Sequence, residues 1–220
     1  FPGERACIPD PYLINQNKTF YEQRLEFIGD NNEFIALKEM RNFEREVSGF
    51  IKKIIDFEDN TSSVQPEWEN LLNEHIGKVE ETKLDKEQEI RARTEKIKSL
   101  KTLFTKKFSI LTGRAGTGKT KLLKILIEGF KISEKQTEED FLLLAPTGKA
   151  RVRIRTETGI KAMTIHQHLL QNDWLDDNYE FKTSGGDKDF AKTVIVDECS
   201  MMSLDLFATL LKSLDIDNIQ

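Results

Sequence analysis

A glycine-rich stretch at residues 113–120 constrains this chain more than any other feature. It reads Gly113-Arg114-Ala115-Gly116-Thr117-Gly118-Lys119-Thr120 and fits the pattern G-x-x-x-x-G-K-[ST] at every fixed position. This pattern is typical of phosphate-binding loops when a strand precedes it and a helix follows. The apolar run 108–112 predicts the strand, and apolar residues at helical spacing predict a helix over 119–130. A chance glycine-rich turn, the alternative, would need neither neighbour.

The chemistry of such a loop follows from its backbone. Glycines let successive amide groups turn inward around a polyphosphate, and the next helix points unpaired N–H groups and its positive dipole end at the same anion. Lys119 would place a mobile positive charge on the β and γ phosphates, and Thr120 would offer its hydroxyl to Mg²⁺. The expected ligands are therefore ATP and Mg²⁺.

Two further apolar runs, 141–145 and 193–196, predict buried strands in an α/β fold, with a parallel sheet covered by helices on both faces. Asp197 and Glu198 directly follow the second run. Asp197 would hold Mg²⁺ through water, and Glu198 would orient or deprotonate the attacking water. Alternatively, both acids cap the helix that the spacing predicts over 203–214.

The residues before the loop predict a helical N-terminal region, residues 1–83. An arm with some helix comes first, followed by one long amphipathic helix that runs from Phe34 to near Asp59-Asn60, with Asp30 as its N-cap and Glu33 as the capping partner. Its apolar stripe predicts a packed helical subdomain. A second helix should run from Pro66 to Gly77, and a third over 85–104, where Gln88 stands three residues after Asp85 as a capping partner.

Composition narrows the class of protein. An apolar share of 38% can fill a core, and no apolar run is long enough to span a bilayer, so we expect a soluble, cytoplasmic protein. Cys7 and Cys199 lie far apart, which suits a reducing compartment, and Cys199 is expected to be a small core residue. The chain begins without Met, so we expect it to be part of a longer protein.

Charge leaves two interpretations open. A net charge of −5 argues against a uniformly basic surface, yet residues 147–161 hold five Lys or Arg against one acid. This run could dock a phosphate backbone, or it could be the solvated face of a helix.

Four motifs together resemble those of superfamily 1 DNA helicases, with RecD, the alpha subunit of exodeoxyribonuclease V, as the nearest branch. They are Gly113 to Thr120 (motif I), Ala145-Pro146-Thr147-Gly148-Lys149-Ala150 (motif Ia), Thr164-Ile165-His166 (motif Ib) and Val194-Ile195-Val196-Asp197-Glu198-Cys199-Ser200-Met201 (motif II). The resemblance covers about residues 84–214.

The resemblance implies roles for particular residues. Gln88 would read the adenine edge of ATP. Single-stranded DNA would run along Pro146, Thr147, Gly148, Lys149, Thr164 and His166. Arg151, Arg153 and Arg155 alternate as in a strand, but the family has a helix there, so they are not assigned to DNA. His166 and His168 form an H-x-H without a neighbouring acid or Cys cluster, which argues against zinc.

The resemblance also implies an organisation and an activity. Residues 84–220 would be a RecA-like motor domain that stops before motif III, and the chain would bind Mg²⁺-ATP yet be inactive alone. The full protein would be an ATP-dependent, 5′-to-3′ helicase in DNA repair or recombination, with single-stranded DNA and other repair or nuclease subunits as partners. The alternatives are a P-loop kinase or ATPase acting on another substrate, and a nucleotide-gated interaction module.

Overall fold

The computed structural model describes residues 16–28, 34–56, 64–77, 86–114, 116–182 and 184–219. Its centre is a parallel sheet of three strands in the order β4-β3-β5. β3 (Phe141–Ala145) lies between β4 (Ala162–Thr164) and β5 (Thr193–Val196). β3 and β5 are the two strands that the apolar runs predict, and the helices around them confirm the α/β fold.

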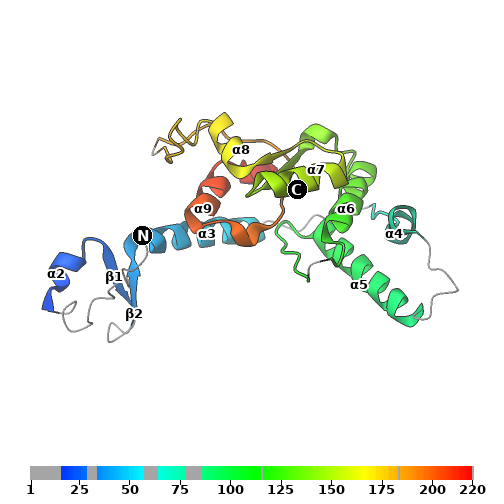
Figure 1. The fold of residues 1–220 in the computed structure, drawn as a ribbon, viewed down its shortest axis with the longest axis horizontal. Helices are drawn as coiled ribbons and strands as arrows, with labels where there is room; N and C mark the ends of the chain where they lie inside the picture. The colour runs from blue at the N-terminus through cyan, green and yellow to red at the C-terminus, as the bar shows by residue number, and fades with distance from the viewer. Residues whose placement is uncertain are drawn as a thin grey trace.

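Helices cover both faces of this sheet (Figure 1). Side chains alternate along a strand, so Phe141 and Leu143 of β3 face one way and Leu142 and Leu144 the other. The first pair packs under α6 (Lys119–Ser133) and α7 (Gly148–Thr158), and the second under α8 (Ile165–Gln171) and α9 (Leu204–Lys212). The helices that follow the phosphate-loop motif and motif Ia therefore share one face.

Two helices that precede the loop pack on α6. They are α4 (Trp68–Ile76) and α5 (Lys86–Thr105), close to the predicted bounds. The Phe104 ring of α5 lies 5.4 Å from that of Trp68 and 4.8 Å from that of Phe130, measured between centroids. α4 ends as predicted at Gly77, whose φ is 92° and whose N–H donates to Asn73 O at 2.9 Å.

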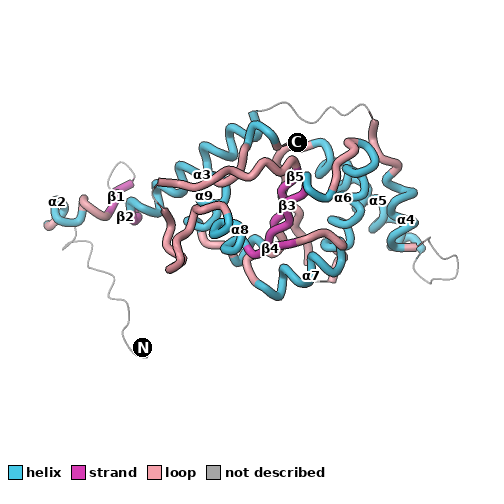
Figure 2. The backbone as a smooth tube through the Cα atoms, turned by 90° about the horizontal axis from the view of Figure 1, so that it is seen from above, coloured by secondary structure: helices cyan, strands magenta, loops and turns pink. Residues whose placement is uncertain are grey.

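The long N-terminal helix packs elsewhere. α3 (Lys38–Asp56) lies against α9, with Val47 and Ile54 buried against Ala208 and Leu211. Figure 2 shows α3 beside α9, while α4 and α5 lie beside α6. The predicted helical subdomain is thus divided between two sides of the sheet.

The start of α3 corrects the prediction of a helix from residue 34. β2 (Phe34–Leu37) pairs antiparallel with β1 (Leu25–Ile28), so the helix begins at Lys38. A short helix, α2 (Lys18–Tyr21), precedes β1. The predicted capping residues Asp30 and Glu33 lie outside the described residues.

The predicted strand over 108–112 is also wrong. These residues form no strand, and the side chain of Ile110 is 69% exposed. Phe108 packs with the α3 and α9 side chains, whereas Leu111 packs with those under α6. Among the described residues β5 pairs only with β3, so the segment finds no backbone partner and its apolar side chains go to two different clusters.

A membrane-spanning helix is not found among the residues described: none combines the required length with sufficient apolar character.

Candidate nucleotide-binding site and strand-edge surface

The phosphate loop leads directly into α6. Gly116 and Gly118 have φ of 78° and 84°, a left-handed conformation that glycine adopts without strain. Gly118 is also the N-cap of α6, and its carbonyl accepts the N–H of Leu122 at 2.9 Å. The first amide groups of α6 are therefore free of helical partners and lie next to the loop, as anion binding requires. Ala115 lies outside the described residues.

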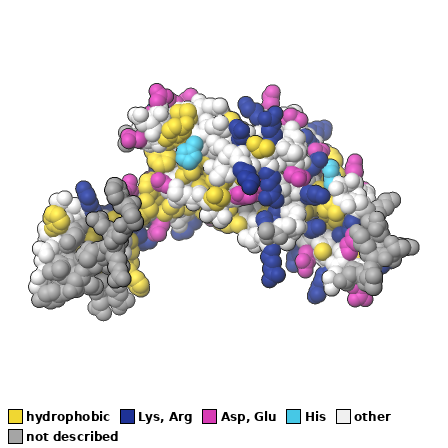
Figure 3. Space-filling view, in the orientation of Figure 1, with side chains coloured by type: hydrophobic (Ala, Val, Ile, Leu, Met, Phe, Trp, Pro, Cys, Tyr) yellow, Lys and Arg dark blue, Asp and Glu magenta, His cyan; other side chains and the backbone are white. Residues whose placement is uncertain are grey.

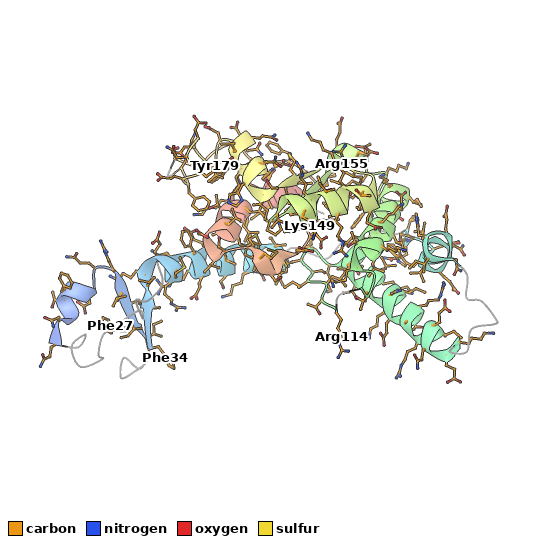
Figure 4. All side chains as sticks on the ribbon, in the orientation of Figure 1. Phe27, Phe34, Arg114, Lys149, Arg155 and Tyr179 are labelled. Carbon is orange, nitrogen blue, oxygen red and sulfur yellow. The ribbon has the colours of Figure 1, made fainter. Side chains whose placement is uncertain are left out.

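Lys119 closes the loop on itself. Its Nζ donates to the carbonyls of Gly113 at 2.7 Å and Arg114 at 3.1 Å. The hydroxyl of Thr117 donates to Arg114 O at 2.9 Å. These contacts hold the ammonium group against the loop at the positive end of the α6 dipole. Arg114 itself is exposed and lies apart from Lys149 (Figure 4).

Asp197 has one carboxylate oxygen without a protein partner. Its N–H continues the strand pairing by donating to Leu144 O at 3.0 Å, and its Oδ1 accepts the N–H of Glu198 at 2.9 Å. Its Oδ2 is buried and has no hydrogen-bond partner among the described residues. A buried oxygen of this kind is costly unless water or a cation satisfies it.

The donor set of the site therefore suits a hard cation. Thr120, in the first turn of α6, has a side chain that is 5% exposed, and its hydroxyl with the Asp197 carboxylate supplies the oxygen ligands that Mg²⁺ prefers. These two residues would hold the ion. Among the described residues no hydrogen bond or ion pair joins the loop to Asp197.

Glu198 is held in a strained backbone conformation. Its φ is 56°, a value uncommon for residues other than glycine and typical of functional sites. Its Oε1 lies 3.6 Å from Nη1 of Arg153, on α7. Neither acid caps α9, because a 3-10 turn, Cys199–Met201, intervenes and Ser203 is the N-cap. The capping alternative is therefore wrong, and Cys199 is exposed, contrary to prediction.

The predicted DNA-contacting residues lie together at the carboxyl ends of β3 and β4. Ala145 is paired with Thr164, so motif Ia leaves β3 beside the point where motif Ib leaves β4. Pro146, Thr147 and Thr164 are half-buried, and Gly148 and Lys149 are exposed.

The threonines in this group are helix caps. The hydroxyl of Thr147 accepts the N–H of Ala150 at 3.3 Å at the start of α7, and that of Thr164 accepts the N–H of Gln167 at 3.2 Å at the start of α8. Arg151 Nη1 donates to Gln167 Oε1 at 3.4 Å and so joins the two helices. Lys and Arg side chains gather over α7, next to a histidine exposed over α8 (Figure 3). Part of the basic run 147–161 thus lies at the carboxyl ends of β3 and β4, beside motifs Ia and Ib.

The two histidines of the H-x-H lie in different surroundings. The half-buried His166 ring faces Tyr179, with centroids 6.2 Å apart and planes at 65°. His168 is fully buried, and Asn172 Nδ2 can only donate to its Nδ1, at 3.2 Å. Its Nε2–H therefore donates to Ser213 Oγ at 3.2 Å. Burial lowers the pKa of His168, and the Asp189 carboxylate opposes this only in part.

Gln88 does not lie beside the phosphate loop. It is exposed in the first turn of α5, the end of the helix far from α6 (Figure 1). A helix of 20 residues spans roughly 30 Å, and the chain reaches the loop only after its other end. Asp85, its predicted capping partner, lies outside the described residues. The geometry therefore gives the adenine role of Gln88 no support.

Comparison with known proteins adds three findings. The family model described as an AAA domain matches residues 96–220. An uncharacterized protein of Methanocaldococcus jannaschii, MJ1519, is 26% identical over an alignment of 227 residues, which covers 94% of this chain and 19% of that protein. The RecBCD enzyme subunit RecD of Mycolicibacterium smegmatis is 32% identical over 125 residues, covering 48% of this chain and 22% of that protein. The chain spans about a fifth of the length of these curated relatives.

Proposed function

Since this chain belongs to the AAA domain family, we propose that it is the nucleotide-binding motor domain of an ATP-dependent DNA helicase or translocase of the RecD type. It is a P-loop NTPase of a superfamily 1 helicase-like family. We further propose that this helicase moves 5′-to-3′ along DNA and acts in DNA repair or recombination.

One observation carries the proposal. The acids that follow β5 and the motif Ia and Ib residues that follow β3 and β4 stand at the carboxyl ends of adjacent strands, where ligands of α/β sheets bind. Arg153 joins the two groups, because its helix begins in motif Ia and its guanidinium reaches Glu198. An enzyme that couples hydrolysis to movement on a strand needs such a neighbouring pair of sites.

Each group has a proposed task in hydrolysis. The amides at the start of α6 and the ammonium of Lys119 bind the β and γ phosphates of ATP. Mg²⁺, held by Thr120 and Asp197, would neutralise charge on those phosphates. Glu198 orients the attacking water and accepts its proton. Its exposed carboxylate is free to reach a water once Arg153 releases it.

The DNA contact is proposed to be independent of sequence. Lys149 supplies a charge for phosphate, while the small residues Thr147 and Gly148 let a backbone approach the first turn of α7. RecD of Mycolicibacterium smegmatis is a subunit of the RecBCD enzyme. By analogy, other repair or nuclease subunits are proposed as partners.

Two titrations test the proposal. Labelled ATP with Mg²⁺ should bind the 220-residue chain, and a fluorescent single-stranded oligonucleotide should bind it weakly with a steep salt dependence. ATP binding without any DNA binding would contradict the helicase assignment and favour an ATPase, a kinase or a nucleotide-gated interaction module. If ATP fails to bind, the nucleotide site itself is wrong.

A further inference from the structure

A short hairpin between α8 and β5 presents an exposed aromatic ring. Leu175 and Phe181 form an antiparallel bridge, and the turn between them carries Tyr179, whose side chain is 60% exposed. Leu175 is 1% exposed and packs with the α8 and α9 side chains. The hairpin is therefore rooted in the core while its tip faces solvent.

The backbone at the tip is fixed by a local hydrogen-bond network. Asp176 Oδ1 accepts the N–H groups of Asn178 and Glu180, both at 2.9 Å, and Asp176 O accepts the N–H of Tyr179 at 2.9 Å. Tyr179 has a φ of 63°, which is costly for a bulky side chain and is maintained only where the surroundings impose it. The turn therefore holds the backbone of Tyr179 in one conformation, with its ring exposed at the tip of the hairpin.

The position of the ring indicates which ligand. Its centroid is 6.2 Å from that of His166, in an edge-to-face arrangement. His166 lies in the first turn of α8, two residues after Thr164, at the carboxyl ends of β3 and β4 where motif Ia and motif Ib meet. In Figure 4 Tyr179 lies at the hairpin beside α8, and Lys149 lies on α7.

We propose that Tyr179 is a stacking platform for one base of single-stranded DNA that follows this strand edge, with His166 supporting the ring from its side. This rests on the proposed function, because it requires the strand to run past motif Ib. An aromatic face accepts any base, which suits an enzyme that moves along DNA without reading it.

The charges around the hairpin tip indicate how the DNA strand would be oriented. The hairpin carries Asp176, Asp177 and Glu180, which repel phosphate, whereas Lys149 and the arginines of α7 attract it. The bases would therefore face Tyr179, and the phosphates would face α7. A DNA strand bound in this orientation would contact the hairpin through its bases and α7 through its phosphates.

Substitution by asparagine provides a clean test. Asn tolerates left-handed backbone better than most residues, so Tyr179→Asn removes the ring and keeps the turn, and Tyr179→Phe keeps the ring without its hydroxyl. We expect Tyr179→Asn to weaken binding of a labelled oligodeoxythymidylate at least about five-fold, as loss of one stacked base does. Tyr179→Phe should bind like the unmodified chain. Phe34→Ala, which removes a ring that is 65% exposed on the distant β2 (Figure 4), is the control and should change nothing.

Salt dependence separates stacking from charge. Tyr179→Asn should lower affinity at every salt concentration and leave the slope of log affinity against log salt unchanged, because no phosphate contact is lost. A 2-aminopurine base in the oligonucleotide should lose fluorescence on binding the unmodified chain and regain it with Tyr179→Asn. If Lys149→Ala weakens binding while Tyr179→Asn does not, the stacking platform is wrong and the DNA-binding function survives. If the unmodified chain binds no DNA, both are overturned.

Discussion

The indole ring of Trp68 lies directly over the backbone of Gly129. A β carbon built on Gly129 would come within 2.4 Å of Cη2 of the indole and 3.3 Å of Cγ of Pro66. Gly129 lies inside α6, and Trp68 opens α4, so this contact sets how closely α4 approaches the helix that begins at the phosphate loop. Glycine is costly inside a helix, and the fit against the ring offsets that cost.

Gly129→Ala should therefore destabilise the fold, because the new methyl group must displace a buried ring. We expect a loss of about 1–3 kcal/mol in the free energy of unfolding. Gly49→Ala is the matched control: Gly49 is also helical, in α3, and its β carbon would meet nothing within 4 Å. That variant should be neutral or up to about 1 kcal/mol more stable. Urea unfolding of both variants measures the difference, and equal stabilities would contradict the close contact.

Lys119→Ala should abolish most nucleotide affinity while the fold remains intact. Its ammonium contacts only loop carbonyls among the described residues, and hydrogen bonds to charged groups contribute about 1.5–3 kcal/mol. Loss of roughly ten- to a hundred-fold in ATP affinity is expected, with little change in thermal melting. Lys121→Ala, on the exposed side of α6, removes the same charge and should bind nearly normally. Unchanged affinity in Lys119→Ala would refute the phosphate-loop assignment.

ATP turnover by the 220-residue chain should stay near background, with or without DNA. Lys119, Asp197 and Glu198 supply one cation, a metal ligand and a base, but charge developing on the γ phosphate also needs arginines that the proposed helicase contributes from a second motor domain. An arginine finger is worth about 10³ to 10⁵ in rate. Steady-state phosphate release measures this, and brisk DNA-stimulated turnover by residues 1–220 would favour a self-contained ATPase.

Lys149→Ala should weaken DNA binding by removing one phosphate contact. The slope of log affinity against log salt should fall by about 0.7, the value for one phosphate of a single strand. Fluorescence anisotropy at several salt concentrations gives both quantities. Lys98→Ala, an exposed lysine on α5, is the control for net charge. If the two variants behave alike, residues 147–161 are a solvated helix face.

Acid should destabilise the fold through His168. Its pKa is lowered below the ordinary 6.5 by burial, so the unfolded chain takes up the proton first. The contribution of His168 is fully present above pH 6.5 and is lost as pH falls through its folded pKa. Unfolding free energies at about pH 7.5 and about pH 5.5 should differ less in His168→Gln than in the unmodified chain, because an amide does not titrate. His75→Gln, on α4, should retain the full difference.

Elements with a clear local apolar pattern could be predicted from the sequence. Elements that depend on a partner distant in sequence could not. β3 is a fully apolar run and was predicted to the residue, and α5 within a residue or two. The apolar positions of residues 34–37 continue the spacing of the following helix and so predict helix there, but their backbone pairs with residues 25–28. Residues 108–112 look like a strand by composition, yet a strand also requires a neighbour, which no local pattern reveals.

The candidate site shows the same division. The glycine pattern indicates where left-handed backbone is needed, and Gly118 adopts it. The sequence indicates neither the contact of Arg153 with Glu198 nor the role proposed for Tyr179, because both depend on tertiary placement. The run Asp176-Asp177-Asn178 between two apolar residues is turn chemistry and could have indicated the hairpin. Nothing in it indicates that His166 lies opposite.

The packing of α3 against α9 has a consequence for biosynthesis. Residues 38–56 leave the ribosome long before residues 204–212 are synthesised. Val47 and Ile54 therefore lack their packing partners Ala208 and Leu211 until those residues have been made, after all three strands of the parallel sheet. Contacts so distant in sequence form late and leave apolar surface open in the meantime. The nascent chain should therefore be a chaperone client, and α3 should be the last helix to become protected from protease.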